Sequence, residues 1–179
     1  MIGVIDVIQK QRTGKGFGGI LRYCLDQSRE RGHEGAHIIE TDLAGRTADE
    51  LAREMEAVAG LRPRVEKPVY HVSLRLAPGE RISDERWREI SRQYLERMGF
   101  GERGYVVVAH PGSRHDPHAG HVHIIANRVP YDGGKAWRDS HDYYRSERVV
   151  RQLEREHHLE RAREKDREYG RDIERPRER

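Results

Sequence analysis

Alternating apolar and polar residues predict a series of short β-strands along the chain. The alternation is strict over residues 69–76, where Tyr, Val and Leu side chains share one face and His, Ser and Arg side chains the other. Residues 121–127 alternate in the same way and are rich in β-branched side chains, which favour strands. Residues 105–109 form a continuous apolar run, and residues 1–8 and 36–40 are shorter Ile- and Val-containing segments that we also predict as strands.

Between these segments the apolar residues recur with helical spacing. Thr47 and Glu50 form a capping-box pattern at the start of one predicted helix, and Ser83 and Gly99 are typical start and stop residues of another. The predicted helices cover residues 20–30, 47–59, 84–98 and 141–168.

The order of these elements predicts an α/β (α+β) fold. The strands at 105–109 and 121–127 are joined by a loop without a helix, which favours antiparallel pairing. We therefore expect a mostly antiparallel central sheet flanked by helices, forming one domain over residues 1–159. Residues 160–179 have almost no apolar side chains, so we expect a charged helical or disordered tail. If the chain is part of a longer protein, this tail would be the start of a linker to further domains.

Composition narrows the class of protein. The chain has 179 residues, of which 36% are charged and 35% hydrophobic, with a net charge of +3. Nearly all of the basic residues are arginine, which suits phosphate contacts and makes a nucleic-acid partner plausible. Cys24 is the single cysteine, which excludes an internal disulfide and a cysteine-rich zinc module. Without a segment apolar enough to span a membrane, and without a secretory pattern, we expect a soluble cytoplasmic protein.

Histidines carry the strongest chemical signal in the sequence. Five of the eleven histidines fall within fourteen residues: His110, His115, His118, His121 and His123. Because successive side chains of a strand alternate, His121 and His123 project from one face, while Val122, Ile124 and Ala126 face the core. Imidazoles grouped on a rigid face can hold a divalent metal and leave positions open for water or substrate. The alternative is a polar strand face that only contacts solvent.

Several motifs in order resemble those of plasmid-mobilisation relaxases, and more narrowly the MOB-P class of HUH endonucleases. These motifs are a basic glycine-rich loop followed by Leu-Arg-Tyr23, Tyr70-His-Val-Ser-Leu-Arg-Leu-Ala-Pro-Gly-Glu80, Val106-Val-Val-Ala-His110, and His121-Val-His-Ile-Ile-Ala-Asn-Arg-Val129. The resemblance covers most of residues 1–159. It implies an HUH-like nuclease domain that nicks and rejoins one DNA strand at a plasmid origin of transfer, for conjugative mobilisation.

The resemblance also implies roles for individual residues. By helical pattern alone Tyr23 is interpreted as a half-buried helix residue; by resemblance it is the nucleophile that keeps the 5′ end of the cut strand as a phosphotyrosine. A divalent metal, Mg²⁺ or Mn²⁺, would be held by three imidazoles and would polarise the phosphate. The implied partners are single-stranded origin-of-transfer DNA, accessory mobilisation (relaxosome) proteins and a coupling protein.

The identity of the third metal ligand stays open between three histidines. The resemblance favours His110, at the end of its strand, together with His121 and His123. The spacing from His110 to His121 is longer than the family's usual gap, so His115 or His118 is an alternative. The acid that often follows the first histidine is replaced by Gly112, which leaves Asp116 as a candidate partner of a ligand imidazole.

The remaining candidates are a catalytic serine and a set of DNA contacts. Ser73 shares its strand face with His71, and either lies near the scissile phosphate or is simply exposed. The glycine-rich loop over residues 10–19 lacks the P-loop spacing, but it could let the backbone approach a phosphate chain. The candidate DNA-binding residues are Lys15, Arg22, Arg75, Asn127 and Arg128.

Three competing functions can be compared with this hypothesis. A rolling-circle replication initiator shares the chemistry but usually carries its tyrosine after the histidine strand. A non-catalytic DNA-binding module stabilised by a metal predicts a closed four-ligand site and no cleavage. A cupin-type metalloenzyme would require a glutamate soon after His123, where Ile, Ile, Ala and Asn follow.

Overall fold

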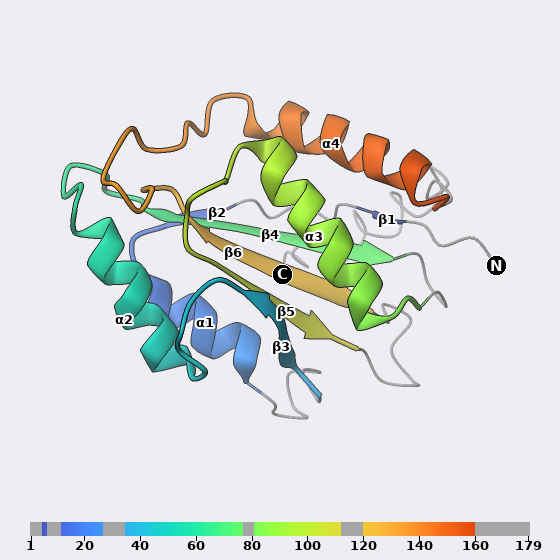
Figure 1. The fold of residues 1–179 in the computed structure, drawn as a ribbon, viewed down its shortest axis with the longest axis horizontal. Coiled ribbons are helices and arrows are strands. Elements are labelled where there is room, and N and C mark those ends of the chain that lie inside the picture. Colours follow the sequence, from blue (N-terminus) through green and yellow to red (C-terminus); the bar gives the residue numbers. More distant parts are fainter. Residues whose placement is uncertain (1–4, 7–11, 27–34, 77–80, 112–119, 160–179) are drawn as a thin grey trace, which may run out of the picture.

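One antiparallel sheet, covered by helices on both faces, organises the chain in the computed structural model (Figure 1). The structure describes residues 5–6, 12–26, 35–76, 81–111 and 120–159. Among these, the strands are β1 (Ile5–Asp6), β2 (Arg12–Gly14), β3 (His37–Thr41), β4 (Val69–Leu76), β5 (Tyr105–His110) and β6 (His121–Asn127). The helices are α1 (Phe17–Leu25), α2 (Ala48–Ala59), α3 (Asp84–Met98) and α4 (Asp142–Glu156).

The strand order is β1-β4-β6-β5-β3, with β2 pairing beside β1 on the same edge of β4. All of these pairs are antiparallel, which confirms the predicted fold class. The long central strands β4 and β6 pair over seven residues, and β6 also pairs with β5 along its length. The middle of the sheet is therefore its most completely hydrogen-bonded part, and it carries the histidines.

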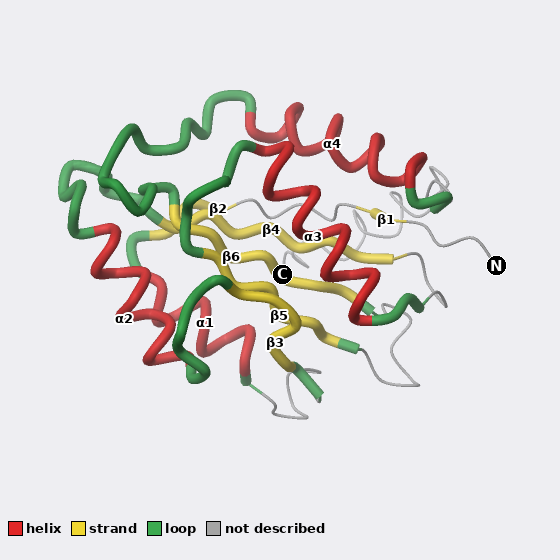
Figure 2. The backbone as a smooth tube through the Cα atoms, viewed as in Figure 1, coloured by secondary structure: helices red, strands yellow, loops and turns green. Residues whose placement is uncertain are grey.

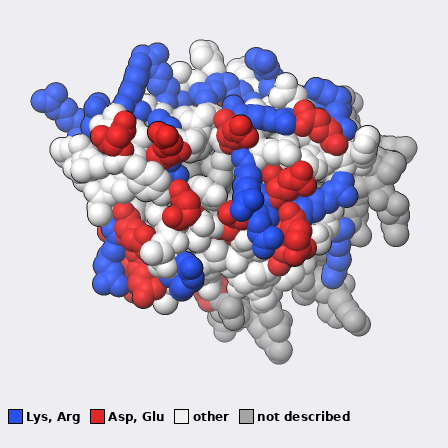
Figure 3. All heavy atoms as spheres, in the orientation of Figure 1, with Lys and Arg blue, Asp and Glu red and all other residues white. Residues whose placement is uncertain are grey.

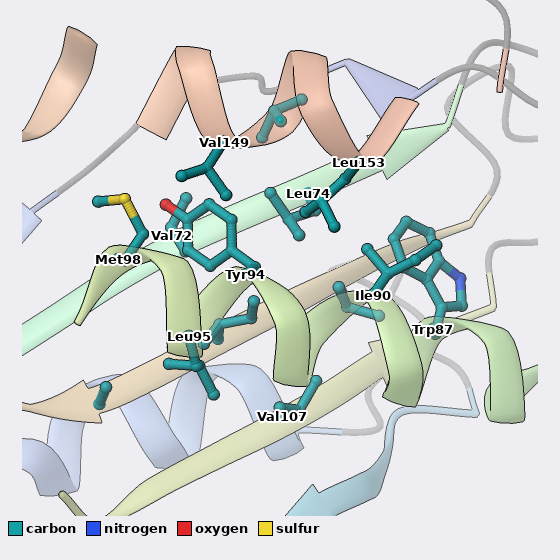
Figure 4. Packing of buried hydrophobic residues seen from close by; sticks show 14 of the residues in the cluster. Val72, Leu74, Trp87, Ile90, Tyr94, Leu95, Met98, Val107, Val149 and Leu153 are labelled. Carbon is teal, nitrogen blue, oxygen red and sulfur yellow. The ribbon is translucent and has the colours of Figure 1, made fainter. Parts of the chain in front are cut away.

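Helices α3 and α4 pack on one face of the sheet (Figure 4). The alternation predicted for β4 and β6 is confirmed, because Val72, Leu74, Val122 and Ile124 are fully buried in this cluster. Each such buried side chain contributes roughly 1.5–3 kcal/mol. Across this core the hydroxyls of Tyr70, Tyr94 and Ser146 form a chain of hydrogen bonds of 2.6 and 2.7 Å that joins β4, α3 and α4.

Helices α1 and α2 cover the opposite face, but only in part (Figure 2). Their buried side chains, including Leu21 and Met55, pack on Val106, Val108 and Ile125 of the sheet. Toward the ends of β5 and β4, and the start of β6, the residues on this face are polar. The sheet thus has an apolar half under the two helices and a histidine-rich half beside them.

The helix caps follow the sequence. The Thr47 side chain accepts a hydrogen bond from the backbone N–H of Glu50, and the Glu50 carboxylate accepts one from the backbone N–H of Thr47. This pair of bonds confirms the capping box. Ser83 caps α3, and Gly99 ends it in the left-handed conformation with φ 83°. These caps fix where α2 and α3 begin and where α3 ends.

Two predicted helices, α1 and α4, have wrong boundaries. The segment 10–19 is not all loop, since β2 pairs with the edge of β4 and α1 begins at Phe17 rather than Ile20. Phe17, Leu21 and Cys24 lie at helical spacing and are fully buried, and this burial outweighs the low helix propensity of Gly18 and Gly19. The other end is also wrong, because α1 ends at Leu25 rather than near residue 30, and the backbone of its C-cap residue Asp26 is already extended.

Helix α4 ends at Glu156, well before the predicted residue 168. His158 adopts a positive φ of 50°, and Leu159 turns back into the core beneath α3 and α4. The gain from burying Leu159 therefore ends the helix. The predicted tail at 160–179, and the predicted strand residues 1–4 and 7–8, lie outside the described residues.

Candidate functional site: a histidine centre beside a tyrosine

Three histidines from two neighbouring strands meet on the half-open face of the sheet. His110 on β5 pairs directly opposite His121 on β6, and His123 follows on the same face. The rings are 4.7 to 5.0 Å apart between centroids. One ring nitrogen from each of the three lies within 4.8 Å of the others, so the group could hold a divalent metal ion. We call these three residues the histidine centre.

The histidine centre is largely shielded from solvent. His110 is 1% exposed and His123 8%, while His121 is half-buried. Burying polar imidazoles requires partners for their nitrogens, since an unsatisfied polar group in the interior is costly. Three neutral imidazoles can supply three nitrogen lone pairs to a metal ion and leave its other coordination positions open, as catalytic metal sites require.

His110 is anchored to helix α1 through a backbone group. Its Nε2 donates to the carbonyl oxygen of Cys24 at 2.7 Å. Because a carbonyl only accepts, Nε2 carries the proton in this arrangement and Nδ1 keeps the lone pair. The Cys24 thiol itself is buried, and burial raises its pKa to about 12.

Tyr23 lies next to Cys24 on α1 and is 45% exposed. Its ring meets the His123 ring edge-on, with 6.4 Å between centroids. Tyr23 and Arg22 also line a groove of about 780 Å³ that runs past Ala36 and Arg46. The phenol is therefore exposed to solvent on one side and faces an imidazole of the histidine centre on the other.

β4 contributes polar residues to the other side of the histidine centre. Ser73 pairs opposite His123, and Arg75 pairs opposite His121. Both are half-buried. The sheet register therefore brings the predicted serine and one predicted DNA-binding arginine next to the histidines, as the shared face of the strands requires.

His71 is hydrogen-bonded to a member of the histidine centre. Its Nε2 lies 2.8 Å from Nδ1 of His123, and the two rings stack with an interplanar angle of 25°. His71, Cys24 and His123 also form a second group whose ligand atoms lie within 4.8 Å of one another. His123 thus belongs to two overlapping sets of potential metal ligands.

A family model for the relaxase nuclease domain, described as MobA/VirD2-like, matches residues 23–159. The chain belongs to this relaxase family. The matched region begins at Tyr23 and includes every histidine of the centre. No curated protein matched the chain significantly. Membership supports a DNA relaxase role, that of a DNA-nicking enzyme that binds single-stranded DNA and uses a divalent metal, for which the histidine groups are suitable.

The predicted DNA contacts of the relaxase domain fall into two groups. Lys15, two residues before α1, and Arg22, within α1, are both exposed. Arg75 pairs opposite His121 of the histidine centre. Arg22 is paired with Asp49, with nitrogen–oxygen distances of 2.9 and 2.8 Å. Such an exposed pair contributes little to stability, so Arg22 can exchange Asp49 for a phosphate at small cost.

Asn127 and Arg128 instead serve the fold. Asn127 is fully buried, donates to the Met55 carbonyl at 2.8 Å and accepts from the Val129 backbone at 3.0 Å. The Arg128 guanidinium binds the carbonyls of Trp137 and Lys67. In this structure both side chains are hydrogen-bonded within the protein, and their contacts with DNA stay predictions. A single sequence does not separate a polar residue that faces DNA from one that binds a main-chain carbonyl inside the protein.

His115, His118 and Asp116 lie outside the described residues. Among the histidines that the structure does place, His110 is the one that joins His121 and His123.

Two contacts at the site were not predicted from the sequence. His71 was expected to share a face with Ser73, but its bond to His123 depends on the register between β4 and β6. The Cys24 carbonyl had no signal at all, because every residue has a carbonyl and only the packing of α1 brings this one to His110.

No helix among the described residues is long and apolar enough to cross a membrane.

Figure 3 shows the molecule in the view of Figure 1, with α4 along the upper edge, α3 in the middle and α2 at the lower left. Lys and Arg atoms gather along the upper edge, where α4 lies, and basic and acidic atoms are mixed elsewhere. Arg97, Arg145 and Arg148 line a smaller hollow of about 330 Å³ on this side. Arg97 is paired there with Glu156, so part of this charge is already neutralised.

Proposed function

We propose that this chain is a MOB-P class relaxase of the HUH type that nicks and rejoins one DNA strand at a plasmid origin of transfer. The observation that carries the proposal is the position of Tyr23, whose ring lies 6.4 Å from His123 within a region matched by the relaxase nuclease family. A tyrosine beside three clustered imidazoles supplies both a nucleophile and a metal site for phosphodiester cleavage.

In the proposed reaction the Tyr23 hydroxyl attacks the scissile phosphorus. The Tyr23 oxygen forms a new bond to phosphorus, the bond to the 3′ oxygen breaks, and a 5′-phosphotyrosine and a free 3′ hydroxyl result. The phenol proton leaves to a base, and the 3′ oxygen takes up a proton as it departs. Attack by a 3′ hydroxyl on the phosphotyrosine runs the same steps backward and rejoins the strand.

His110, His121 and His123 would hold the divalent metal, which would offset negative charge on the phosphate oxygens when bound. Mg²⁺ prefers oxygen ligands, so of the two expected ions Mn²⁺ suits three imidazole nitrogens better. Ser73, opposite His123, would donate a hydrogen bond to the phosphate. Lys15, Arg22 and Arg75 would bind the DNA backbone as it enters and leaves the centre.

The test is covalent adduct formation. The protein is incubated with supercoiled plasmid carrying the DNA next to its own gene, with Mg²⁺ or Mn²⁺, and resolved on a denaturing gel. We expect a metal-dependent protein–DNA band that Tyr23→Phe abolishes, because phenylalanine lacks the attacking oxygen. Tyr144→Phe is the matched control: this tyrosine is 66% exposed but lies on α4, across the sheet, and its variant should react like the parent.

An adduct that persists in Tyr23→Phe would overturn the nucleophile assignment, and its loss in Tyr144→Phe would assign the nucleophile to Tyr144 instead. Nicking that leaves no protein attached would instead indicate hydrolysis, and primer extension would locate the cut in either case. Origin DNA is the expected substrate; equal cleavage of an unrelated plasmid would contradict a role in transfer.

One observation favours a second candidate, a non-catalytic DNA-binding module with a structural metal. Cys24, His71 and His123 form a set of one sulfur and two nitrogen ligands typical of zinc. This alternative predicts tightly bound zinc that is lost in Cys24→Ser, together with DNA binding and no adduct. Metal analysis of the purified protein and its Cys24→Ser variant distinguishes the two functions.

A further inference from the structure

The side chain of His71 lies diagonally across the sheet from His123. In the β4–β6 register His71 pairs with Ile125, and Ser73 pairs with His123, so His71 and His123 are diagonal neighbours on one face. The two rings stack with 5.1 Å between centroids. Two adjacent strands in the middle of the sheet hold the backbones of both residues, so their separation is set by the sheet.

The contact between the two rings is a hydrogen bond. Nε2 of His71 and Nδ1 of His123 are 2.8 Å apart, within the range of N–H hydrogen bonds. Such a bond needs a proton on one nitrogen and a lone pair on the other. If Nδ1 of His123 carries the proton, its Nε2 keeps the lone pair and is the nitrogen able to bind a metal.

Histidine ligands in metal sites usually donate their second ring N–H to a partner that fixes the tautomer and ring orientation. The usual partners are carboxylates, backbone carbonyls or water. A backbone carbonyl plays this part for His110, through Cys24. For His123, the group in the corresponding position is another imidazole.

We propose that His71 is a positioning residue that accepts the Nδ1 proton of His123, fixes its ring against β4 and leaves Nε2 free to bind the divalent metal. This inference rests on the proposed function, because it takes His123 as a metal ligand. His71 itself binds neither metal nor DNA in this arrangement. Its effect on the reaction is transmitted through the orientation of His123.

The test measures Mn²⁺ binding without DNA, by the loss of the free-ion electron paramagnetic resonance signal. We expect His71→Ala to weaken Mn²⁺ binding by about 10-fold or more, the effect typical of lost ligand partners. His71→Gln should recover most of the affinity, since its amide oxygen can accept the same proton. His37→Ala is the matched control, because His37 also bonds through Nε2, to Asp84, but lies outside the histidine centre.

A second readout follows the tautomer directly. In metal-free protein, ¹⁵N ring shifts should place the proton of His123 on Nδ1, and His71→Ala should remove that preference. If His71 has only a structural role, His71→Ala should lower the melting temperature of the protein without changing the tautomer of His123. Unchanged Mn²⁺ affinity in His71→Ala would overturn the proposal.

Other outcomes distinguish this proposal from alternative roles of His71 and from failure of the proposed function. A fall in affinity for Cys24→Ser, together with no recovery in His71→Gln, would make His71 a direct ligand and overturn its positioning role. If His121→Ala binds Mn²⁺ as tightly as the parent protein, the histidine centre is not the metal site, and the positioning role of His71 is overturned with it. Failure of adduct formation in the nicking assay, with normal Mn²⁺ binding, would overturn only the proposed reaction.

Discussion

Asn127 shows how a polar residue close to the histidine strand serves packing. Both ends of its amide are used inside the protein, toward Met55 of α2 and the backbone of Val129. It thereby joins the end of β6 to helix α2 below the sheet. The residue keeps β6 in place, and β6 carries two members of the histidine centre.

We expect Asn127→Ala to lower the free energy of unfolding by roughly 1–3 kcal/mol, because it leaves a buried carbonyl and a buried N–H without their partner. The measurement is urea unfolding followed by circular dichroism. Ser140→Ala, an exposed substitution in the same part of the chain, should change stability little. If Asn127→Ala weakens DNA binding of the folded protein and leaves stability intact, the residue contacts DNA after all.

At this scale the sequence predicted which residues cluster but not how they are bonded. The two-residue period placed His121 and His123 on one face, and the apolar run before His110 placed it at a strand end. Bonds such as those of His71 and Asn127 depend on strand register and on helix packing. Neither can be read from local periodicity.

Among the elements, α3 has the most complete sequence signals. Ser83 caps its start, and Gly99 ends it in a left-handed conformation that side chains disfavour. Trp87, Ile90 and Tyr94 then face the sheet at helical spacing. The prediction of α3 was correct at both ends because caps are local chemistry.

We expect Gly99→Ala to destabilise the protein by about 1–2 kcal/mol, the cost of placing a side chain in the left-handed region. Steric conflict is not the cause, because an added Cβ would approach no closer than 4.0 Å to Trp137. Gly101→Ala is the matched control, since it has open space around it and no positive φ. Thermal unfolding of the two variants gives the comparison, and equal melting temperatures would contradict this account.

The elements that were predicted wrongly lack such local signals. Helix α1 begins among glycines because Phe17 gains a buried site against the sheet. Helix α4 ends early because Leu159 returns to the core. In both cases tertiary burial, which depends on distant residues, outweighs helix propensity.

For the molecule as a whole, the two faces of the sheet divide structural from chemical roles. The α3–α4 face holds the larger apolar core, and the histidine centre lies on the face covered by α1 and α2. Basic residues occur on both sides, so net charge alone does not locate the DNA. The histidine face is the one we expect to bind it.

We expect the affinity for single-stranded DNA to fall with salt, and Arg75→Gln to reduce the slope of log K against log salt by about 0.7, the value for one phosphate contact. Fluorescence anisotropy with a labelled oligonucleotide between low and moderate salt measures this slope. Arg148→Gln, an exposed arginine on the α3–α4 face, should leave the slope unchanged. The reverse pattern would place DNA on the other face.

The link between α1 and His110 has a consequence for how the site tolerates substitution. Its acceptor is the main-chain carbonyl of Cys24, so no exchange of side chain at this position deletes the bond. Any residue small enough for the buried space and compatible with a helix would preserve it. Substitutions at residue 24 should therefore affect stability through the volume and polarity of the new side chain in this buried apolar space, while the bond to His110 remains. Replacing the main-chain amide after residue 24 by an ester, which weakens its carbonyl as an acceptor, would be needed to weaken the link between α1 and His110.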